Sequence, residues 1–296
     1  MCKVSILVPV FNQETYIKEA LKSILNQSFK SFEIIIINDG STDKTLEIIK
    51  SFKDKRIKIF STKNKGIISA LNYGIEKCTS NIIARFDGDD IMLSERLKIQ
   101  YDTFIKKKPI LLGSNAYIID SNSILIGKSN LPIKKNNIRS NLLKLAPSFF
   151  HSSVMFNKER IKRLGGYNLN AQYVEDYDLW LSLYKEGVVL NIYKPLIKYR
   201  VHNESISKKN KYEAKLNSLI SLKNHILNNC RLSDINYLKF KNEIQKNGFF
   251  LFVFKIDFIL WKIKSKKEYF NLLDKIFVSP LILLRNFLMP FYKYLI

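Results

Sequence analysis

The sequence predicts an α/β fold: a Rossmann-like, mostly parallel sheet with helices on both faces, followed by a C-terminal helical extension. Three observations favour it. Short apolar runs alternate with segments of helical spacing across residues 4–86. Polar residues directly follow each apolar run, as they do at strand ends in α/β sheets. The last part of the chain loses this alternation and becomes basic and amphipathic, which predicts a separate helical region.

Four apolar runs have the length of buried strands: residues 4–10, 32–37, 57–60 and 81–86. Between them, residues 16–25 and 67–75 place apolar side chains three and four positions apart, and residues 44–52 follow a helix-capping pattern. A helix between two neighbouring strands makes those strands parallel, and such helices cover the sheet.

Polar segments follow the strands at their carboxyl ends, the edge where α/β sheets bind ligands. They are Pro9-Val10-Phe11-Asn12, Asn38-Asp39-Gly40-Ser41-Thr42-Asp43, Asn64-Lys65-Gly66 and Asp87-Gly88-Asp89-Asp90. Because parallel strands end at the same edge, we expect the four segments to line one crevice.

The acidic run, residues 87–90, follows the fourth predicted strand directly. Hard divalent cations such as Mg²⁺ and Mn²⁺ bind carboxylate oxygens together with the phosphates of a nucleotide. The run therefore suggests a metal-assisted reaction on a phosphorylated substrate. Asp and Gly are also common in solvated turns, which is the alternative interpretation.

A second acidic position lies after the second strand. Asp39 follows four isoleucines and precedes Gly40, so its carboxylate can face the crevice and accept a hydrogen bond from a nucleobase. Ser41, Thr42 and Asp43 suit the N-cap of the following helix at least as well as they suit a ligand contact. Asp39 is therefore the binding candidate of this loop.

Together these segments resemble the family 2 glycosyltransferases with the GT-A fold, which use nucleotide-activated sugars. The matching segments, in chain order, are residues 4–12, 38–43, 64–66, 85–90 and 175–180. They cover roughly the first two-thirds of the chain, and several motifs in order are more specific than any one of them. The resemblance implies a UDP-sugar donor, an inverting reaction, and Mn²⁺ or Mg²⁺ as the cofactor.

The resemblance assigns the nucleotide contacts residue by residue. Asp39 matches the aspartate that holds the uracil ring, and Pro9 and Phe11 match the loop beneath the nucleoside. Asp87 matches the first aspartate of an Asp-x-Asp pair, near the ribose. Asp89 matches the second aspartate, which binds the metal that bridges the diphosphate.

Arg85 and Asn64 are further candidates for the lining of the nucleotide pocket. Each has an alternative. Arg85 is also suited to be an inward charge paired with Asp43 or Asp90, and Asn64 is also suited to be a turn residue before Gly66.

Residues 175–184 predict a helix with a broad apolar face. Its first residues, Glu175 and Asp176, lie where the helix dipole stabilises a carboxylate, so capping alone would explain them. The resemblance implies more, because Asp176 matches the catalytic base of inverting members, which takes a proton from the acceptor hydroxyl. Glu175 and Trp180 are predicted on the acceptor side.

Two of the three histidines enter the prediction. His202 follows a strand-like stretch, and in related enzymes such a histidine reaches the metal. Imidazole is a usable ligand for Mn²⁺, and a surface-loop histidine is the alternative. His151 resembles a segment near the acceptor, but a core histidine with satisfied hydrogen bonds fits equally well.

The formal net charge of +23 would attract anions such as nucleotide sugars and anionic lipids. Nucleic acid is disfavoured because no basic-aromatic recognition motif is present.

We predict a catalytic domain at residues 1–205 and a helical, basic-amphipathic region at residues 206–296. That region either binds the membrane surface or packs on the domain or on a second subunit of a homo-oligomer. Pro280, Arg285 and Pro290 interrupt its last apolar segment, which argues against a spanning helix.

The three cysteines have neither disulfide nor metal spacing, and the chain starts in a strand pattern rather than a signal peptide. We therefore expect a cytoplasmic protein that is peripheral at the inner face of the cell membrane.

The expected function is the inverting transfer of a sugar from a UDP-sugar to a hydroxyl of a saccharide or lipid-linked saccharide in cell-surface glycan synthesis. One alternative is a nucleotidyltransferase, although residues 9–12 are not the glycine-rich, basic loop that it would ordinarily need. The other is a non-catalytic membrane-associated module of the same fold.

Overall fold

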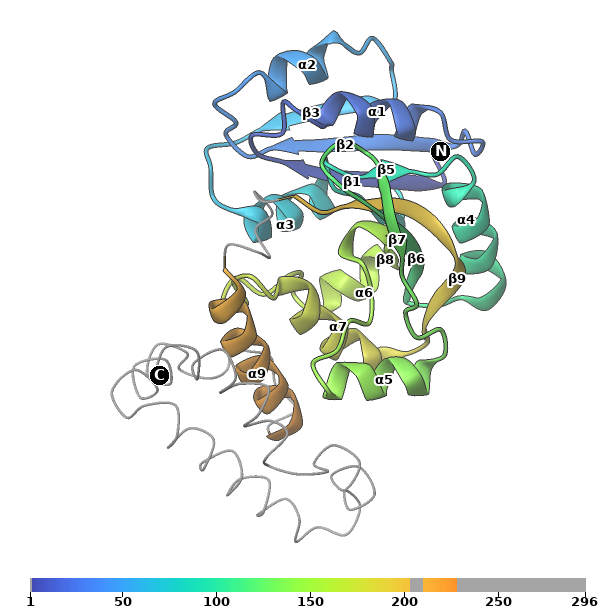
Figure 1. Ribbon diagram of the computed structural model, residues 1–296, viewed down its shortest axis with the longest axis vertical. Helices are drawn as coiled ribbons and strands as arrows, with labels where there is room; N and C mark the ends of the chain where they lie inside the picture. The colour runs from blue at the N-terminus through green and yellow to red at the C-terminus, as the bar shows by residue number, and fades with distance from the viewer. Residues whose placement is uncertain (1, 203–209, 228–296) are drawn as a thin grey trace, which may run out of the picture. The chain divides into compact units, whose positions relative to one another are not determined.

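The computed structural model describes residues 2–202 and 210–227 (Figure 1). They fall in one compact unit, Met1–Ile235. The membrane or packing role predicted for residues 206–296 therefore lies almost entirely outside the described residues. Within the described ranges, no helix combines the length and the apolar character that crossing a membrane requires.

The chain follows the predicted alternation of strands and helices. The strands are β1 (Val4–Val10), β2 (Phe32–Asn38), β3 (Ile57–Ser61), β4 (Ile82–Arg85), β5 (Ile91–Met92), β6 (Leu111–Ile119), β7 (Leu125–Lys128), β8 (Met155–Asn157) and β9 (Val189–Arg200). The helices are α1 (Ile17–Leu25), α2 (Thr45–Ser51), α3 (Ile67–Lys77), α4 (Arg96–Lys107), α5 (Lys135–Leu143), α6 (Lys158–Arg163), α7 (Glu175–Glu186) and α9 (Lys211–Leu227).

The described strands form one nine-stranded sheet in the order β3-β2-β1-β4-β8-β6-β9-β5, and β7 pairs with β6 beside this path. The parallel arrangement predicted for the N-terminal half is confirmed, because β1 pairs parallel with β2 and β4, and β2 with β3. The second half adds antiparallel pairings of β8 with β4 and of β7 with β6, so the whole sheet is mixed. A tight turn joins β6 to β7, and such a turn permits only antiparallel pairing.

β1 and β2 are buried along their whole length and mostly apolar, because helices cover both faces of the sheet. Leu7 and Ile35 face a core cluster that includes α3 and α7, whereas Ile6 and Ile34 face a cluster that includes α1 and α4. Figure 1 shows α1 and α3 on opposite sides of the sheet. Gly74 permits the close approach of α3, since a Cβ there would lie 2.2 Å from Leu7 Cδ1.

Glu33 in β2 is a buried carboxylate with several partners. It accepts hydrogen bonds from Ser5 Oγ (2.6 Å), Thr79 N (2.7 Å) and Thr79 Oγ1 (2.6 Å), and it pairs with Lys58 Nζ at 2.7 Å. Burial alone would raise the pKa of Glu33. The Lys58 contact and the hydrogen bonds outweigh burial and lower this pKa from 4.5 to about 2.

The depressed pKa of Glu33 predicts a loss of stability at acid pH. Because the pKa is lower in the folded state, the stabilisation is present above the ordinary value of 4.5 and disappears as the pH falls toward 2. Between about pH 7 and about pH 3, we expect the wild type to lose about 2 kcal/mol more unfolding free energy than Glu33→Gln. Denaturant titrations across this range measure the difference. Parallel pH profiles of the two proteins would contradict the assignment.

Candidate active site

Asp39, at the end of β2, is buried and holds the loop that follows β3. Its Oδ1 accepts hydrogen bonds from Thr62 Oγ1 (3.1 Å) and Lys65 N (3.0 Å), and its Oδ2 accepts one from Gly66 N (2.8 Å). An ionised carboxylate offers about four acceptor positions, so capacity remains for a ligand N–H. Asp39 therefore positions this loop, and its contact with a uracil ring remains a prediction.

Asn64 lies in the loop that Asp39 holds. Its Oδ1 accepts a hydrogen bond from Gly66 N (3.2 Å), which is the turn role considered from the sequence. The same loop lies against Gly40, whose φ is +74° and where a Cβ would be 2.7 Å from Asn64 N. Glycine is thus required at the end of β2 both by its backbone conformation and by the space available. A nucleotide contact of Asn64 remains a prediction.

The loops after β1 and β2 are joined by hydrogen bonds. Asn12 N donates to Ser41 Oγ (3.1 Å), and Thr42 N donates to Asn12 Oδ1 (2.9 Å). Phe11 is exposed beside this junction, whereas Pro9 is buried within β1. These hydrogen bonds hold the loop that carries the exposed Phe11 ring. The position of Phe11 beneath a nucleoside remains a prediction.

Asp43 supports the capping interpretation of its segment. Its Oδ1 accepts a hydrogen bond from Thr45 N (3.0 Å) at the start of α2, and its Oδ2 accepts one from Glu14 N (3.0 Å). Burial raises the pKa of Asp43, but the hydrogen bonds together outweigh burial and lower this pKa below its usual value. The carboxylate is therefore occupied in joining α2 to the segment that leads into α1.

Three carboxylates gather after β4. Oxygen atoms of Asp87, Asp89 and Asp90 lie within 4.8 Å of one another. Asp89 Oδ2 is 3.0 Å from His202 Nε2. Asp90 Oδ1 accepts a hydrogen bond from Arg200 N (2.8 Å), and among the described residues its buried Oδ2 has no hydrogen-bond partner. Clustered carboxylate oxygens, one of them buried without a partner, fit Mg²⁺ or Mn²⁺, and the imidazole of His202 lies beside them.

The electrostatics of this cluster also favour a cation. Burial raises the pKa of Asp87 to about 6, although its ion pair with Arg85 opposes the shift. Burial and the neighbouring carboxylates raise the pKa of Asp90 well above its usual range. The buried Arg85 thus pairs with Asp87 rather than with Asp43 or Asp90, and it does not neutralise the whole cluster.

Arg200, at the end of β9, is a site residue that the sequence reasoning missed. It is buried, and its Nε donates to Asp89 O (2.7 Å) while its Nη2 contacts Glu19 Oε2 at 2.6 Å. Its guanidinium also stacks over Tyr16, 4.5 Å from the ring centroid. Arg200 therefore fixes the backbone of the acidic run, and its position two residues before His202 in a strand-like stretch was the available signal.

The two acids of the second half begin α7 as predicted. Asp176 Oδ1 accepts a hydrogen bond from Tyr177 N (2.6 Å). Burial raises the pKa of both carboxyls, and for Glu175, to which the charge of Asp176 also contributes, it reaches about 8. Glu175 is therefore mostly protonated at neutral pH, and the role of Asp176 as the catalytic base remains a prediction.

His151 lies next to these acids. Its Nε2 is 2.8 Å from Tyr167 OH, and its Nδ1 is 4.0 Å from Glu175 Oε1. Burial lowers the pKa of His151 well below its usual range, so the ring is neutral. Trp180 is buried and meets the His151 ring edge-on at 5.7 Å between centroids. His151 and Glu175 are thus adjacent, Trp180 supports them from the core, and Tyr167 joins the site without having been predicted.

Comparison with known proteins decides the family. Residues 5–165 match the family model described as glycosyl transferase family 2, and this match covers more than half of the chain. The chain belongs to glycosyltransferase family 2. It is therefore a glycosyltransferase, as the motifs in the first two-thirds of the sequence predict.

Two curated relatives of this family 2 glycosyltransferase have named pathways. The O-antigen biosynthesis glycosyltransferase WbnJ of Escherichia coli is 34% identical over 215 residues, which cover 69% of this chain and 82% of WbnJ. The amylovoran biosynthesis glycosyltransferase AmsE of Erwinia amylovora is 30% identical over 214 residues, which cover 69% of this chain and 79% of AmsE.

Solved structures share the fold at lower sequence identity. S. aureus TarS in complex with UDP-GlcNAc superposes with a TM-score of 0.63 at 20% identity, covering 76% of this chain and 67% of that chain. The mannosyltransferase PcManGT from Pyrobaculum calidifontis, in complex with GDP-Man and Mn²⁺, gives a TM-score of 0.56 at 18% identity, covering 74% of this chain and 62% of that chain. The predicted GT-A fold is thereby confirmed.

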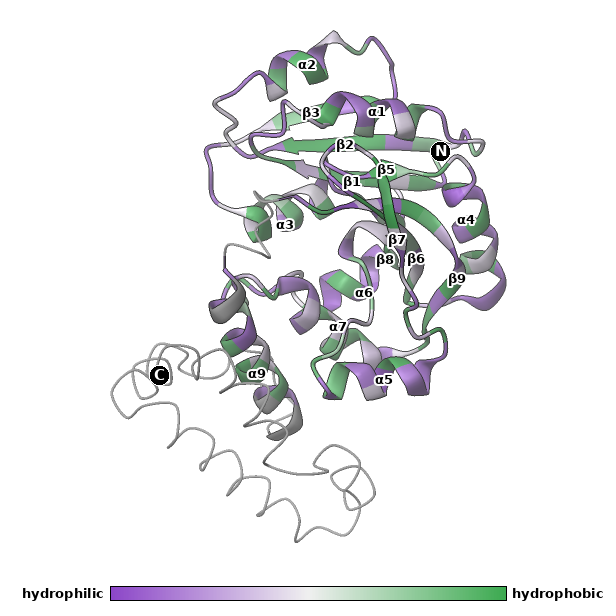
Figure 2. Cartoon of the chain, in the orientation of Figure 1, coloured by the Kyte–Doolittle hydropathy of each residue, from purple (hydrophilic) through white to green (hydrophobic). Residues whose placement is uncertain are grey.

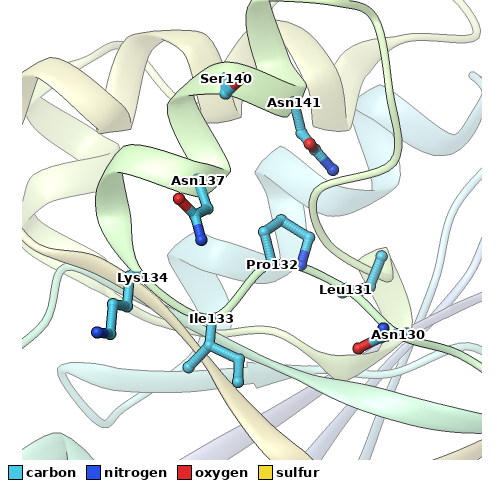
Figure 3. Close-up of a pocket in the computed structure, with 8 residues that line it drawn as sticks. All are labelled: Asn130, Leu131, Pro132, Ile133, Lys134, Asn137, Ser140 and Asn141. Carbon is cyan, nitrogen blue, oxygen red and sulfur yellow. The ribbon is translucent and has the colours of Figure 1, made fainter.

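The family 2 glycosyltransferase also has a pocket of ≈ 570 Å³ between α5 and the segment before it (Figure 3). Its lining residues are Asn130, Leu131, Pro132, Ile133, Lys134, Asn137, Ser140 and Asn141. Asn191 Nδ2 donates to Pro132 O (2.7 Å) and Ser148 O (2.8 Å), which ties one side of the pocket to the segment before His151. None of the predicted site residues lines this pocket.

Proposed function

We propose that this glycosyltransferase transfers a sugar from a UDP-sugar to a hydroxyl of a saccharide or lipid-linked saccharide, with inversion at the anomeric carbon. The observation that carries the proposal is that one buried arginine, Arg85, interacts electrostatically with carboxylates on both sides of the site. The charge of Arg85 acts on Asp87 after β4 and on Glu175 and Asp176 at the start of α7. Electrostatic interactions of this kind fall off with distance, so the donor-side and acceptor-side carboxylates belong to one site.

The relatives support the class of donor and product. WbnJ and AmsE are named for O-antigen and amylovoran biosynthesis, and TarS is solved with UDP-GlcNAc. A role in synthesis of a cell-surface polysaccharide follows by analogy. The nucleotidyltransferase alternative loses its support, because the chain belongs to a glycosyltransferase family.

On the donor side, the chain's residues hold the nucleotide and its leaving group. Asp39 accepts a hydrogen bond from the uracil, and Arg85 holds the carboxylate of Asp87 in place near the ribose. Asp89 would hold Mn²⁺ or Mg²⁺, with His202 at its side, and the bound ion would supply positive charge to the departing diphosphate. The leaving group then needs no proton.

On the acceptor side, Asp176 serves as the base. Its Oδ1 is engaged by Tyr177 N, so Oδ2 takes the proton of the acceptor hydroxyl. The hydroxyl oxygen forms a bond to the anomeric carbon as the bond from that carbon to the diphosphate oxygen breaks, and UDP leaves with the electron pair. A single displacement inverts the configuration at the anomeric carbon.

The remaining parts of the proposal concern location. A lipid-linked acceptor would place the enzyme at the cytoplasmic face of the cell membrane, in contact through residues 206–296. The +23 net charge suits an anionic membrane surface. A homo-oligomer formed through the same residues is the competing arrangement.

The donor is tested by a screen of UDP- and GDP-sugars for nucleotide release, with Mn²⁺ or Mg²⁺ present and after chelation with EDTA. We expect release of UDP from at least one UDP-sugar, and we expect chelation to stop it. Release of GDP alone would overturn the donor assignment, and turnover unaffected by chelation would overturn the metal assignment.

Asp39→Ala is expected to weaken UDP binding by about 10-fold or more, because a hydrogen bond to a charged group is worth about 1.5–3 kcal/mol. Loss of the loop contacts is a separate effect, and Thr62→Val controls for it by removing one hydrogen bond to Asp39 while keeping the carboxylate. Calorimetric titration with UDP measures both variants. An unchanged affinity in Asp39→Ala, or an equal loss in Thr62→Val, would count against the uracil contact.

A further inference from the structure

The hairpin of β6 and β7 exposes a run of aliphatic side chains. Ile124, Leu125 and Ile126 are 60%, 60% and 59% exposed. Leu125 and Ile126 are successive residues of β7 and point to opposite faces, so the exposure of both means that both faces of the hairpin meet solvent here. Figure 2 shows the green of hydrophobic residues on β7, which begins with Leu125 and Ile126. Exposed, consecutive aliphatic residues on an edge strand promote aggregation unless a binding partner covers them.

Basic and aromatic side chains border this run. Lys128 Nζ lies over the ring of Tyr193, 5.4 Å from its centroid, and Tyr193 is 61% exposed. Lys194 is exposed beside it. Across the sheet, Tyr117 pairs with Lys128 of β7 on one side and with Lys198 of β9 on the other, and directly paired residues share a face. The aliphatic run therefore continues into a face that carries lysines and tyrosines.

The hairpin turn is ordered and tied to the acidic run of the active site. Arg200 Nη1 donates to Asp120 O (3.2 Å), Ser121 O (3.2 Å) and Ser123 Oγ (2.9 Å), while Arg200 Nε donates to Asp89 O (2.7 Å). One buried side chain thus connects the turn with the backbone of Asp89. Whatever binds the exposed hairpin is held at a fixed place relative to the catalytic edge.

We propose that this hairpin surface, Ile124–Ile126 with Lys128, Tyr193 and Lys194, docks on an anionic lipid bilayer. The aliphatic side chains enter the acyl boundary, the tyrosine lies at the interface, and the lysines meet the lipid phosphates. The bordering lysines favour an anionic bilayer as the occupant, and a second copy of the chain is the competing outcome that the experiment below distinguishes. Its residues are other than 206–296, the region that the proposed function assigns to the membrane, so the inference goes beyond that proposal.

Vesicle co-sedimentation of the full-length protein tests this surface, with phosphatidylcholine vesicles that contain or lack phosphatidylglycerol. The triple variant Ile124→Ser, Leu125→Ser, Ile126→Ser removes the aliphatic run. A matched control replaces three exposed aliphatic residues elsewhere on the described surface: Ile105→Ser, Leu169→Ser, Val188→Ser. The expected result is about a tenfold or greater loss of binding to anionic vesicles for the hairpin variant and little change for the control.

A charge variant, Lys128→Gln with Lys194→Gln, is expected to lose affinity for anionic vesicles and to keep the weak binding to neutral ones. UDP release from a soluble donor serves as the readout of folding and of the proposed function, and it should remain unchanged in the hairpin and charge variants. Vesicle binding by the hairpin triple variant equal to that of the wild type would overturn the proposal. A dimer that the hairpin variant converts to a monomer, with vesicle binding intact, would assign the surface to self-association instead.

Discussion

Asp89→Asn is expected to lower sugar transfer by about 100-fold or more, because it removes a ligand charge from the predicted metal site. The side chain is partly exposed and fills no core volume, so the fold should persist. The amide keeps the shape of the carboxylate. What changes is the attraction for a divalent cation and the charge that faces His202 Nε2, 3.0 Å away. Initial rates of UDP release at increasing Mn²⁺ measure the effect.

Asp102→Asn is the matched control for this substitution. It removes a carboxylate from an exposed pair with Lys98 on α4, away from the acidic run, and should leave the rate within about twofold because exposed pairs contribute little. If Asp89→Asn turned over at the wild-type rate at every Mn²⁺ concentration, Asp89 would not be a metal ligand.

Asp176→Asn is expected to suppress transfer by a factor of about 10² to 10⁴ while leaving donor binding nearly unchanged. The amide has the shape of the carboxylate and still accepts the hydrogen bond from Tyr177 N through its oxygen. It has no basic oxygen left for the proton of the acceptor hydroxyl. The expected signature is a lower kcat with little change in the Kd for the UDP-sugar.

Glu175→Gln separates the two adjacent acids. Because the pKa of Glu175 is about 8, this carboxyl is already largely neutral at pH 7, and an amide should cost less than about tenfold in rate. The rate ranking of the two variants is therefore the readout. A larger loss in Glu175→Gln than in Asp176→Asn would make Glu175 the base.

The sequence predicted the first four strands and the placement of the acidic run because those features are local. The run from Ile34 to Ile37 alternates between two buried faces, and such strands appear as continuous apolar segments. Asp39 and Asp87 come directly after strands, so the topology alone delivers them to one edge of the sheet. The family resemblance added the roles of these residues, which position alone does not give.

Contacts between segments that are distant in the sequence could not be predicted, because they depend on the tertiary fold. Arg200 bonds to Asp89 O across more than a hundred positions, and Tyr167 meets His151 through a loop without periodic pattern. The antiparallel insertion of β8 between β4 and β6 also depends on tertiary packing, because three residues carry no readable period. The sequence offered Asp43 and Asp90 as ion-pair partners of Arg85, and the fold pairs it with Asp87 instead.

The configuration of the first product of donor hydrolysis tests the single-displacement mechanism most directly. Proton NMR, recorded before the released sugar equilibrates in water, distinguishes the two anomers. A direct attack assisted by Asp176 predicts the anomer opposite to that of the UDP-sugar, and in Asp176→Asn this product should form at least about 100-fold more slowly. A first product with the same anomeric configuration as the donor would contradict direct displacement and the role of Asp176 as its base.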